Sequence, residues 1–445
     1  MNNTNFSSKA SHRPDSLTGA IAAFEGIQEA CTLLNGPIGC KMYPAYMSSM
    51  LASHPKTTLV NYFDDFYFGQ TRVPCTYIDQ QDFVYGSESK VTTALKQIEQ
   101  KKYGIIGVIN HSGTSIIGDD LTQIIQNADI NTIAVAVDST GFTGTFASGF
   151  QDTVIKILDR ILLNKNNQKI PHTVNIIGST IFHYNWENDI AEIKRTLELL
   201  GIQTLSVICA GESMANIQKA SQAELNIVLN EEYGDRIATY LETKHAIPSI
   251  DLSLQAPYGL SASETWFKTI ADFFKISNET LTLESRQVRK KCYPALTRAS
   301  SLTDALRGLP FAIFGDSSQV YSLTTFLYEY LGMLPVTIGI KEIGTKNFES
   351  LKNYTTKNLP NTQLVVNPDQ YELIDYLNQT TPHLLLGSSI EKHISLTLQK
   401  PPQFIPITFP YPEKITLTNR PLTGFNGVLT LIEDIVNAIK HSGIA

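Results

Sequence analysis

The sequence predicts an α/β protein in which mainly parallel sheets carry helices on both faces. Two observations favour this class. Short, compact apolar segments, typical of buried parallel strands, alternate along the chain with segments whose apolar residues recur at helical spacing. In addition, the chain has 445 residues with 42% hydrophobic and 17% charged content, which describes a folded protein too long for a single core. Two to three domains are therefore expected.

The charge, apolar pattern and cysteine count of the chain limit its possible partners and cellular location. The net charge is −7 and no dense stripe of Lys and Arg occurs, so a nucleic-acid partner is not expected. The polar segment 1–15 lacks the apolar core of a signal peptide, and no apolar run approaches membrane-spanning length. The five cysteines are scattered and odd in number, which is typical of a reducing cytoplasm rather than of a disulfide framework. We therefore expect a cytoplasmic protein without a membrane partner.

The stretch from Asp15 to Cys40 predicts a helix, a turn, a strand and a tight loop. Asp15 or Ser16 can cap the helix, whose apolar residues then recur at helical spacing. Residues 30–35 are compact and apolar, as a buried parallel strand should be. Residues 36–39 contain one proline and two glycines and cannot continue that strand. Cys40 is therefore expected at the carboxyl end of a strand, where open α/β sheets bind their ligands.

Polar residues also follow the next predicted strand, residues 105–109. His111 and Ser112 stand at its carboxyl end, and Ser87 or Ser89 can begin the helix that precedes it. The other elements expected in this first α/β unit are a helix that begins at Asp119 and Asp120, strand 133–137 and helix 150–163. These segments complete one α/β unit before a polar, charged linker at residues 164–169.

Two further α/β units follow the linker. The second unit is predicted to contain strands 174–177, 205–208 and 225–229, with a helix that ends at Gly201. The third unit begins near Leu309 and is predicted to contain strands 311–314, 336–340, 364–366, 383–386 and 404–407, a helix that ends at Gly332, and a last helix over 428–439. No Walker A pattern, no His-Glu-x-x-His and no Gly-x-Gly-x-x-Gly after a strand occurs. We therefore do not expect this chain to hydrolyse ATP or to bind a dinucleotide in the usual way.

Several sequence phrases together resemble one known family. They are LTGAIAAFEGI at 17–27, GPIGC at 36–40, DFVYGSESK at 82–90, IIGDDL at 116–121 and GFNGVLTLIEDIVNAI at 424–439. In this order they resemble the nitrogenase component 1 (dinitrogenase-like) oxidoreductases, of which this chain looks like a divergent subunit. The family includes nitrogenase subunits, their cofactor-assembly scaffolds, dark-operative protochlorophyllide reductase and the nickel-sirohydrochlorin reductive cyclase of methanogens.

The resemblance implies three Rossmann-like domains, which we place at residues 1–165, 166–300 and 301–445. It also implies an iron–sulfur cluster, of the 4Fe–4S type and shared at a subunit interface if one chain does not complete it. The partners implied are a sister component 1 subunit or a second copy of this chain, and a separate, homodimeric, ATP-hydrolysing iron–sulfur reductase that supplies electrons.

The family's ligand positions are only partly kept. Cys40 matches the ligand of the GPxGC loop, whereas Asp15 and Ser112 stand where the family has two further ligand cysteines. Asn230 stands where nitrogenase anchors its molybdenum–iron cofactor, and the histidine that also holds that cofactor has no counterpart before Gly424. The resemblance therefore implies cluster binding near Cys40 but no molybdenum–iron cofactor on this chain.

Four other assignments each have two interpretations. Cys75 follows a proline near the helix start at Ser87 and is either a cluster ligand or an ordinary thiol, since it matches no family ligand position. Asp15 is either a plain helix cap or an oxygen ligand. His111 is either a proton donor to a substrate, and so the weak candidate for a catalytic residue, or an ordinary strand-end histidine. Cys31 lies on the strand, roughly 20 Å from the loop at ~3.3 Å per residue, which favours a core role.

Three functions follow from these observations. The first is an oxidoreductase subunit that binds a cluster through Cys40, with Cys75 or a partner subunit completing it, and passes electrons to a substrate in the inter-domain cleft. The second is a non-catalytic scaffold on which a metal cluster is assembled. The third is a metal-free Rossmann-type protein that binds a small molecule, an alternative that the small number of cysteines keeps open.

Overall fold

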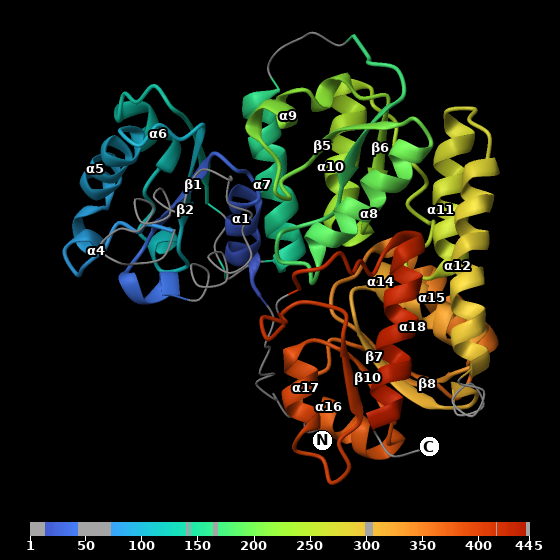
Figure 1. Ribbon diagram of the computed structural model, residues 1–445. Helices are drawn as coiled ribbons and strands as arrows, with labels where there is room; N and C mark the ends of the chain where they lie inside the picture. The colour runs from blue at the N-terminus through green and yellow to red at the C-terminus, as the bar shows by residue number, and fades with distance from the viewer. Residues whose placement is uncertain are drawn as a thin grey trace. The chain divides into compact units, whose positions relative to one another are not determined.

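The computed structural model describes residues 14–42, 73–138, 141, 144–162, 168–298, 306–414 and 416–441. They form two compact units, one within Pro14–Leu252 and the other within Ser253–Ala445 (Figure 1). The predicted α/β class with parallel sheets flanked by helices is confirmed in both. The domain boundaries at 165/166 and 300/301 stay a prediction.

The first sheet of the Pro14–Leu252 unit has three parallel strands in the order β1-β2-β3. They are β1 (Ala30–Asn35), β2 (Ile105–Asn110) and β3 (Ile133–Val137). On one face, α5 (Glu88–Glu99) and α6 (Leu121–Asn127) cover an apolar cluster that contains Cys31. On the other face lie α1 (Ser16–Glu25) and α7 (Phe146–Ile161) (Figure 1). The Phe24 ring of α1 fills the space beside Gly107 of β2. The shorter elements here are α4 (Asp82–Tyr85) and η1 (Thr114–Ile116).

The second sheet of this unit has the order β5-β4-β6, also parallel. Its strands are β4 (Thr173–Ile177), β5 (Gln203–Val207) and β6 (Leu225–Val228). Its helical elements are α8 (Trp186–Leu199), α9 (Met214–Gln218), η2 (Ala220–Gln222) and α10 (Glu231–His245). Every residue of β4 and β6 is buried, as expected for strands covered on both faces.

The Ser253–Ala445 unit contains one parallel sheet of order β11-β10-β7-β8-β9. The strands are β7 (Pro310–Gly315), β8 (Leu334–Ile340), β9 (Gln363–Val366), β10 (Leu384–Gly387) and β11 (Gln403–Pro406). The helical elements are α11 (Leu260–Phe273), α12 (Glu279–Arg298), α14 (Ser317–Thr325), η3 (Phe326–Tyr330), α15 (Thr345–Asn358), α16 (Gln370–Thr380), α17 (Ser389–Ser395) and α18 (Gly424–His441). Helices α11, α12 and α18 pack against one another.

The predicted strands are all present within one or two residues, but three helical regions differ from the prediction. Helix α7 begins at Phe146 instead of residue 150, because Thr145 and Ser148 form a capping box there. The helix predicted to end at Gly332 changes to a π-helical turn at η3. We predicted no element over 231–298, where α10, α11 and α12 lie; of these, α12 is polar and contains Pro294. In the part of the chain that the structure describes, no helix has both the length and the apolar character to cross a membrane.

Helices α1 and α7 touch backbone to backbone through two glycines. A Cβ added to Gly19 would lie 2.1 Å from the carbonyl oxygen of Phe146, and one added to Gly149 would lie 2.0 Å from that of Ser16. At the same end of the pair, Asp15 and Thr145 form an isolated antiparallel β-bridge. The helix starts are therefore fixed relative to each other by contacts that a single methyl group would break.

We expect Gly19→Ala to lower the free energy of unfolding by about 1–3 kcal/mol, because backbone atoms cannot move aside as a side chain can. The gain of roughly 1 kcal/mol from helix propensity does not offset a contact this short. Thermal unfolding followed by circular dichroism measures the effect. Gly39→Ala is the control, since among the described residues nothing lies within 4 Å of an added Cβ there. Equal midpoints for the two variants would contradict the close helix contact.

Candidate functional site

The buried side-chain amide of Asn35, the last residue of β1, connects three segments at the carboxyl end of the first sheet. Its Nδ2 donates to Oδ1 of Asn110, the last residue of β2, and to Oγ of Ser87, both at 2.9 Å. Its Oδ1 accepts from Oγ1 of Thr76 at 2.8 Å. Because every polar atom of the amide is used in a buried environment, the network holds these segments in one arrangement.

The same network places Cys75 beside β1. The backbone N–H of Leu34 donates to the carbonyl of Pro74 at 2.9 Å, and the N–H of Thr76 donates to the carbonyl of Leu34 at 3.1 Å. Cys75 thus forms a parallel β-bridge with Leu34 and is only 5% exposed. No pattern in the sequence indicates this pairing, because it joins residues 41 positions apart.

Cys40 lies where the sequence predicts it, just beyond the carboxyl end of β1. Residues 38–42 form a helical turn rather than the predicted tight loop, and the N–H of Cys40 donates to the carbonyl of Pro37 at 3.2 Å. Burial raises the pKa of the Cys40 thiol. Burial also raises the pKa of Cys75, and charge on Cys40 raises it further. The structure therefore brings Cys40 and Cys75 within electrostatic range of each other.

Lys41 is a site residue that was not predicted from the sequence. Its side chain is 1% exposed, and its Nζ lies 5.6 Å from the ring centroid of Tyr77. Within the described ranges this Nζ has no hydrogen-bond partner. Burial lowers the pKa of Lys41, while the Cys75 thiolate raises it and a Lys41 cation in turn lowers the pKa of Cys75. The one sequence feature that could have indicated Lys41 as a site residue is its position directly after the GPxGC motif.

Asp15 and Ser112 meet at Gly141. A Cβ on Gly141 would lie 2.2 Å from Oδ2 of Asp15 and 3.0 Å from Oγ of Ser112, so only glycine leaves both oxygens their place. Asp15 is the N-cap of α1, and its Oδ1 accepts from the backbone N–H of Thr18 at 2.9 Å and from the Thr18 hydroxyl at 2.8 Å. The capping interpretation of Asp15 is thereby confirmed, and its role as a ligand stays a prediction.

His111 adjoins this pair and the loop after β1. Its Nδ1 accepts from the backbone N–H of Gly113 at 3.1 Å, so the neutral ring carries its proton on Nε2. Burial lowers the pKa of His111, and the Asp15 carboxylate opposes that shift. The ring is therefore neutral at pH 7 and can donate one proton from Nε2.

The predicted ligands thus form two groups, Cys40 with Cys75 and Asp15 with Ser112. In residues 14–42, 73–138 and the other described ranges, no three His, Cys, Asp or Glu side chains come together as a metal site. The assignment of these four residues as ligands stays a prediction. Cys31, by contrast, packs in the apolar cluster under α5 and α6.

The other polar residues named from the sequence make structural contacts. The N–H of Gln123 donates to Asp120, which caps α6, whereas the N–H and hydroxyl of Ser87 donate to Asp119 at 2.7 and 2.6 Å. Asn230 is buried and its Nδ2 donates to the carbonyl of Gly178 at 2.9 Å. These contacts explain the positions of the Asp119, Asp120 and Asn230 side chains without a bound ligand.

Fold and site together define an α/β protein of three parallel sheets with paired thiols at the carboxyl end of the first. Comparison with known protein families identifies the family of this chain. The family model described as nitrogenase component 1 type oxidoreductase matches residues 16–440, so the chain belongs to this family.

Three relatives and structures illustrate the range of the family. The chain is 23% identical to the nitrogenase iron-molybdenum cofactor biosynthesis protein NifE of Methanococcus maripaludis, over 85% of this chain and 75% of that protein. It is also 23% identical to a subunit of the light-independent protochlorophyllide reductase of Chloroflexus aggregans, over 78% of this chain and 63% of that protein. The solved structure "Nitrogenase Cp1 at pH 6.5" superposes with a TM-score of 0.81 at 19% identity, covering 99% of this chain and 95% of that one, which shows the shared fold.

Asp15 can be tested as a cap and as a ligand separately. We expect Asp15→Ala to lower the free energy of unfolding by about 1 kcal/mol through loss of the cap, and Asp15→Ser to retain it. Asp120→Ala is the matched control, since Asp120 caps α6 in the same way and is not a predicted ligand. We expect the iron content of anaerobically purified protein to be the same in all three. If Asp15→Ser kept the stability but lost iron, the carboxylate would be a ligand instead.

Lys41 can be tested without any metal. A buried ammonium without a partner destabilises a folded chain, so Lys41→Met should raise the free energy of unfolding of the chelator-treated protein by roughly 1–3 kcal/mol. Lys90→Met is the control, because Lys90 is paired with Asp79 and Asp82 and its loss should bring no such gain. Denaturant unfolding measures both. A destabilised Lys41→Met protein would show that the ammonium is already compensated.

Proposed function

We propose that this chain is the subunit of a nitrogenase-like oxidoreductase that binds an iron–sulfur cluster through Cys40 and Cys75. The observation that carries the proposal is the buried Lys41 ammonium beside these two thiols. An isolated buried cation is costly, and an anionic, thiolate-held group next to it would compensate the charge. In an ordinary core, a thiol would not need a buried cation beside it.

The residues present fit a shared cluster better than one held by a single chain. A 4Fe–4S cluster is usually held by four thiolates, and Cys40 and Cys75 are two. We propose that a sister subunit or a second copy of this chain supplies the others, in preference to the oxygen atoms of Asp15 and Ser112. No molybdenum–iron cofactor is proposed, because the Asn230 amide donates to a backbone carbonyl.

Each side chain then has a defined role. Burial raises the pKa of the Cys75 thiol, and the Lys41 cation opposes that shift, which favours the thiolate that binds metal. The Asn35 network holds Cys75 against β1, which keeps the two thiols together. His111 holds a proton on Nε2 that a reduced substrate can take. When bound, the cluster supplies one-electron transfer.

The source of electrons is a separate protein in this proposal. The sequence has no phosphate-binding loop, so ATP-driven electron delivery needs a partner, for which we propose the homodimeric iron–sulfur reductase implied by the family resemblance. The composition of this chain, with its scattered, odd number of cysteines, supports a cytoplasmic location for it.

A second candidate function is a non-catalytic scaffold for cluster assembly. It is favoured by the similarity to NifE, a cofactor biosynthesis protein, over 85% of this chain. It also fits the small number of cysteines, since a group that is passed on needs fewer permanent ligands. A metal-free, small-molecule-binding protein is the remaining alternative, and it does not explain the buried Lys41.

We expect Cys40→Ser to remove most of the iron from protein purified anaerobically with a co-expressed reductase, since serine does not replace a soft thiolate. Iron analysis and EPR spectroscopy measure the loss. Cys31→Ala is the control and should keep the iron, because Cys31 packs in the apolar core.

Cys75→Ser distinguishes a site that uses both thiols from one completed mainly by the partner subunit. A loss of iron comparable to that of Cys40→Ser places Cys75 among the ligands. If Cys40→Ser retained the full iron content and EPR signal, the proposal would be wrong and the metal-free alternative would replace it.

A further inference from the structure

The Ser253–Ala445 unit contains a cavity of about 360 Å³ that shares no residue with the thiol site. It lies between the start of α11, the end of α14 with η3, and α15. Its volume is within the range of small-molecule sites, which is roughly 300–1,000 Å³. Six of its lining residues determine what it can bind: Ser322, Thr325, Phe326, Glu329, Tyr330 and Tyr354.

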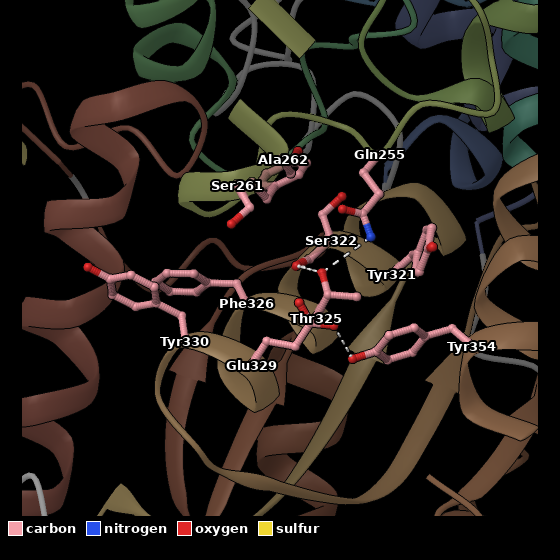
Figure 2. A pocket seen from close by; sticks show the side chains of 11 residues that line it. Gln255, Ser261, Ala262, Tyr321, Ser322, Thr325, Phe326, Glu329, Tyr330 and Tyr354 are labelled. Atoms are coloured by element: carbon pink, nitrogen blue, oxygen red, sulfur yellow. Dashed lines mark hydrogen bonds between the residues drawn. The ribbon is translucent and has the colours of Figure 1, made fainter. Parts of the chain in front are cut away.

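Aromatic rings form two opposite walls of this cavity (Figure 2). Phe326 and Tyr330 stack with centroids 5.4 Å apart and planes at 18°. On the other side, Tyr321 and Tyr354 lie 6.0 Å apart at 60°. Phe326 and Tyr330 both belong to the π-helical turn η3, a type of irregularity that is frequent at functional sites. Burial raises the pKa of all three tyrosines, so the walls are neutral phenol and phenyl rings.

Glu329 lies between the two walls (Figure 2), and its exposed side chain marks the mouth of the cavity. Its Oε1 accepts a hydrogen bond from the Tyr354 hydroxyl at 2.7 Å, which orients the carboxylate. Among the described residues, no Lys, Arg or His lines the cavity or forms an ion pair with Glu329. Arg289, whose charge reaches Tyr330, is already paired with Glu264 at 2.8 Å. The mouth therefore carries a negative charge that the surrounding side chains do not neutralise.

The inner end of the cavity offers little to an anion. The Thr325 hydroxyl donates to the carbonyl of Ser322 at 2.9 Å and accepts from Nε2 of Gln255 at 3.3 Å. These donors are thus occupied with one another, and the described lining includes no cation behind them. Phosphate and carboxylate ligands are disfavoured, whereas a carboxylate with aromatic walls is the usual environment for an organic cation.

We propose that this cavity binds a small organic ammonium ion, held by the Glu329 carboxylate and by cation–π contact with the rings of Phe326 and Tyr330. The proposal does not depend on the cluster function. Glu329 supplies the charge, Tyr354 orients that charge, and the aromatic walls contact the alkyl groups on nitrogen.

The test uses choline as probe and 3,3-dimethyl-1-butanol as its neutral isostere, each titrated into the purified full chain by calorimetry. We expect saturable choline binding and at least tenfold weaker binding of the isostere. Glu329→Gln should weaken choline binding about tenfold, and Tyr330→Leu about fivefold through loss of cation–π contact. Glu349→Gln is the matched control: it removes an exposed carboxylate of α15 that does not line the cavity, and should leave binding unchanged.

Several results would overturn the proposal. Absence of saturable choline binding would do so, as would equal affinity for choline and its isostere, which would mark a merely apolar cavity. If Glu329→Gln bound choline as the parent chain does and had the same unfolding midpoint, the Glu329 carboxylate would not be what holds the ammonium ion. Stronger binding of inorganic phosphate than of choline would show that the charge preference is the reverse of that proposed.

Discussion

The arrangement at the carboxyl end of the first sheet depends on one buried amide, that of Asn35. It joins β1 to β2 through Asn110, to the start of α5 through Ser87, and to the segment of Cys75 through Thr76. Loss of any partner would leave buried polar atoms unsatisfied, at about 1–3 kcal/mol each. The two thiols therefore owe their proximity to hydrogen bonds in which neither takes part.

The fold was predictable because each strand is a local signal. Residues 105–110 and 133–137 are both short, apolar and followed by polar turns. Residues 105–110 form the central strand β2 and are all buried, whereas the edge strand β3 is only partly buried. The site was predictable only where it follows a strand directly, as Cys40, His111 and Ser112 do. The positions of Cys75 and Lys41 depend on pairing and burial between segments that are distant in the sequence, and a periodic pattern of apolar residues does not reveal such contacts. Helix α12 was missed because a polar helix carries a weak apolar pattern. Helices α10 and α11 do carry apolar residues at helical spacing, and the prediction overlooked that pattern.

The family's fold is kept here, and two side chains at positions where the resemblance predicts ligands make structural contacts. Asp15 caps α1 beside Gly141, and Asn230 donates to the carbonyl of Gly178. Each of these side chains thus has a hydrogen-bond partner within the fold and needs no metal to satisfy it. Cys40 and Cys75 lie at the carboxyl end of the first sheet, with the buried Lys41 near Cys75.

The glycine contact between α1 and α7 has a consequence for how the chain is made. Gly19 leaves the ribosome 130 residues before its partner Gly149. At typical elongation rates of 5–20 residues per second, α1 spends on the order of 10 s without the surface that will bury it. Its apolar residues, which are wholly buried in the finished protein, are exposed during that interval. The nascent chain is thus most open to chaperones, and to association with other chains, before the first sheet can close.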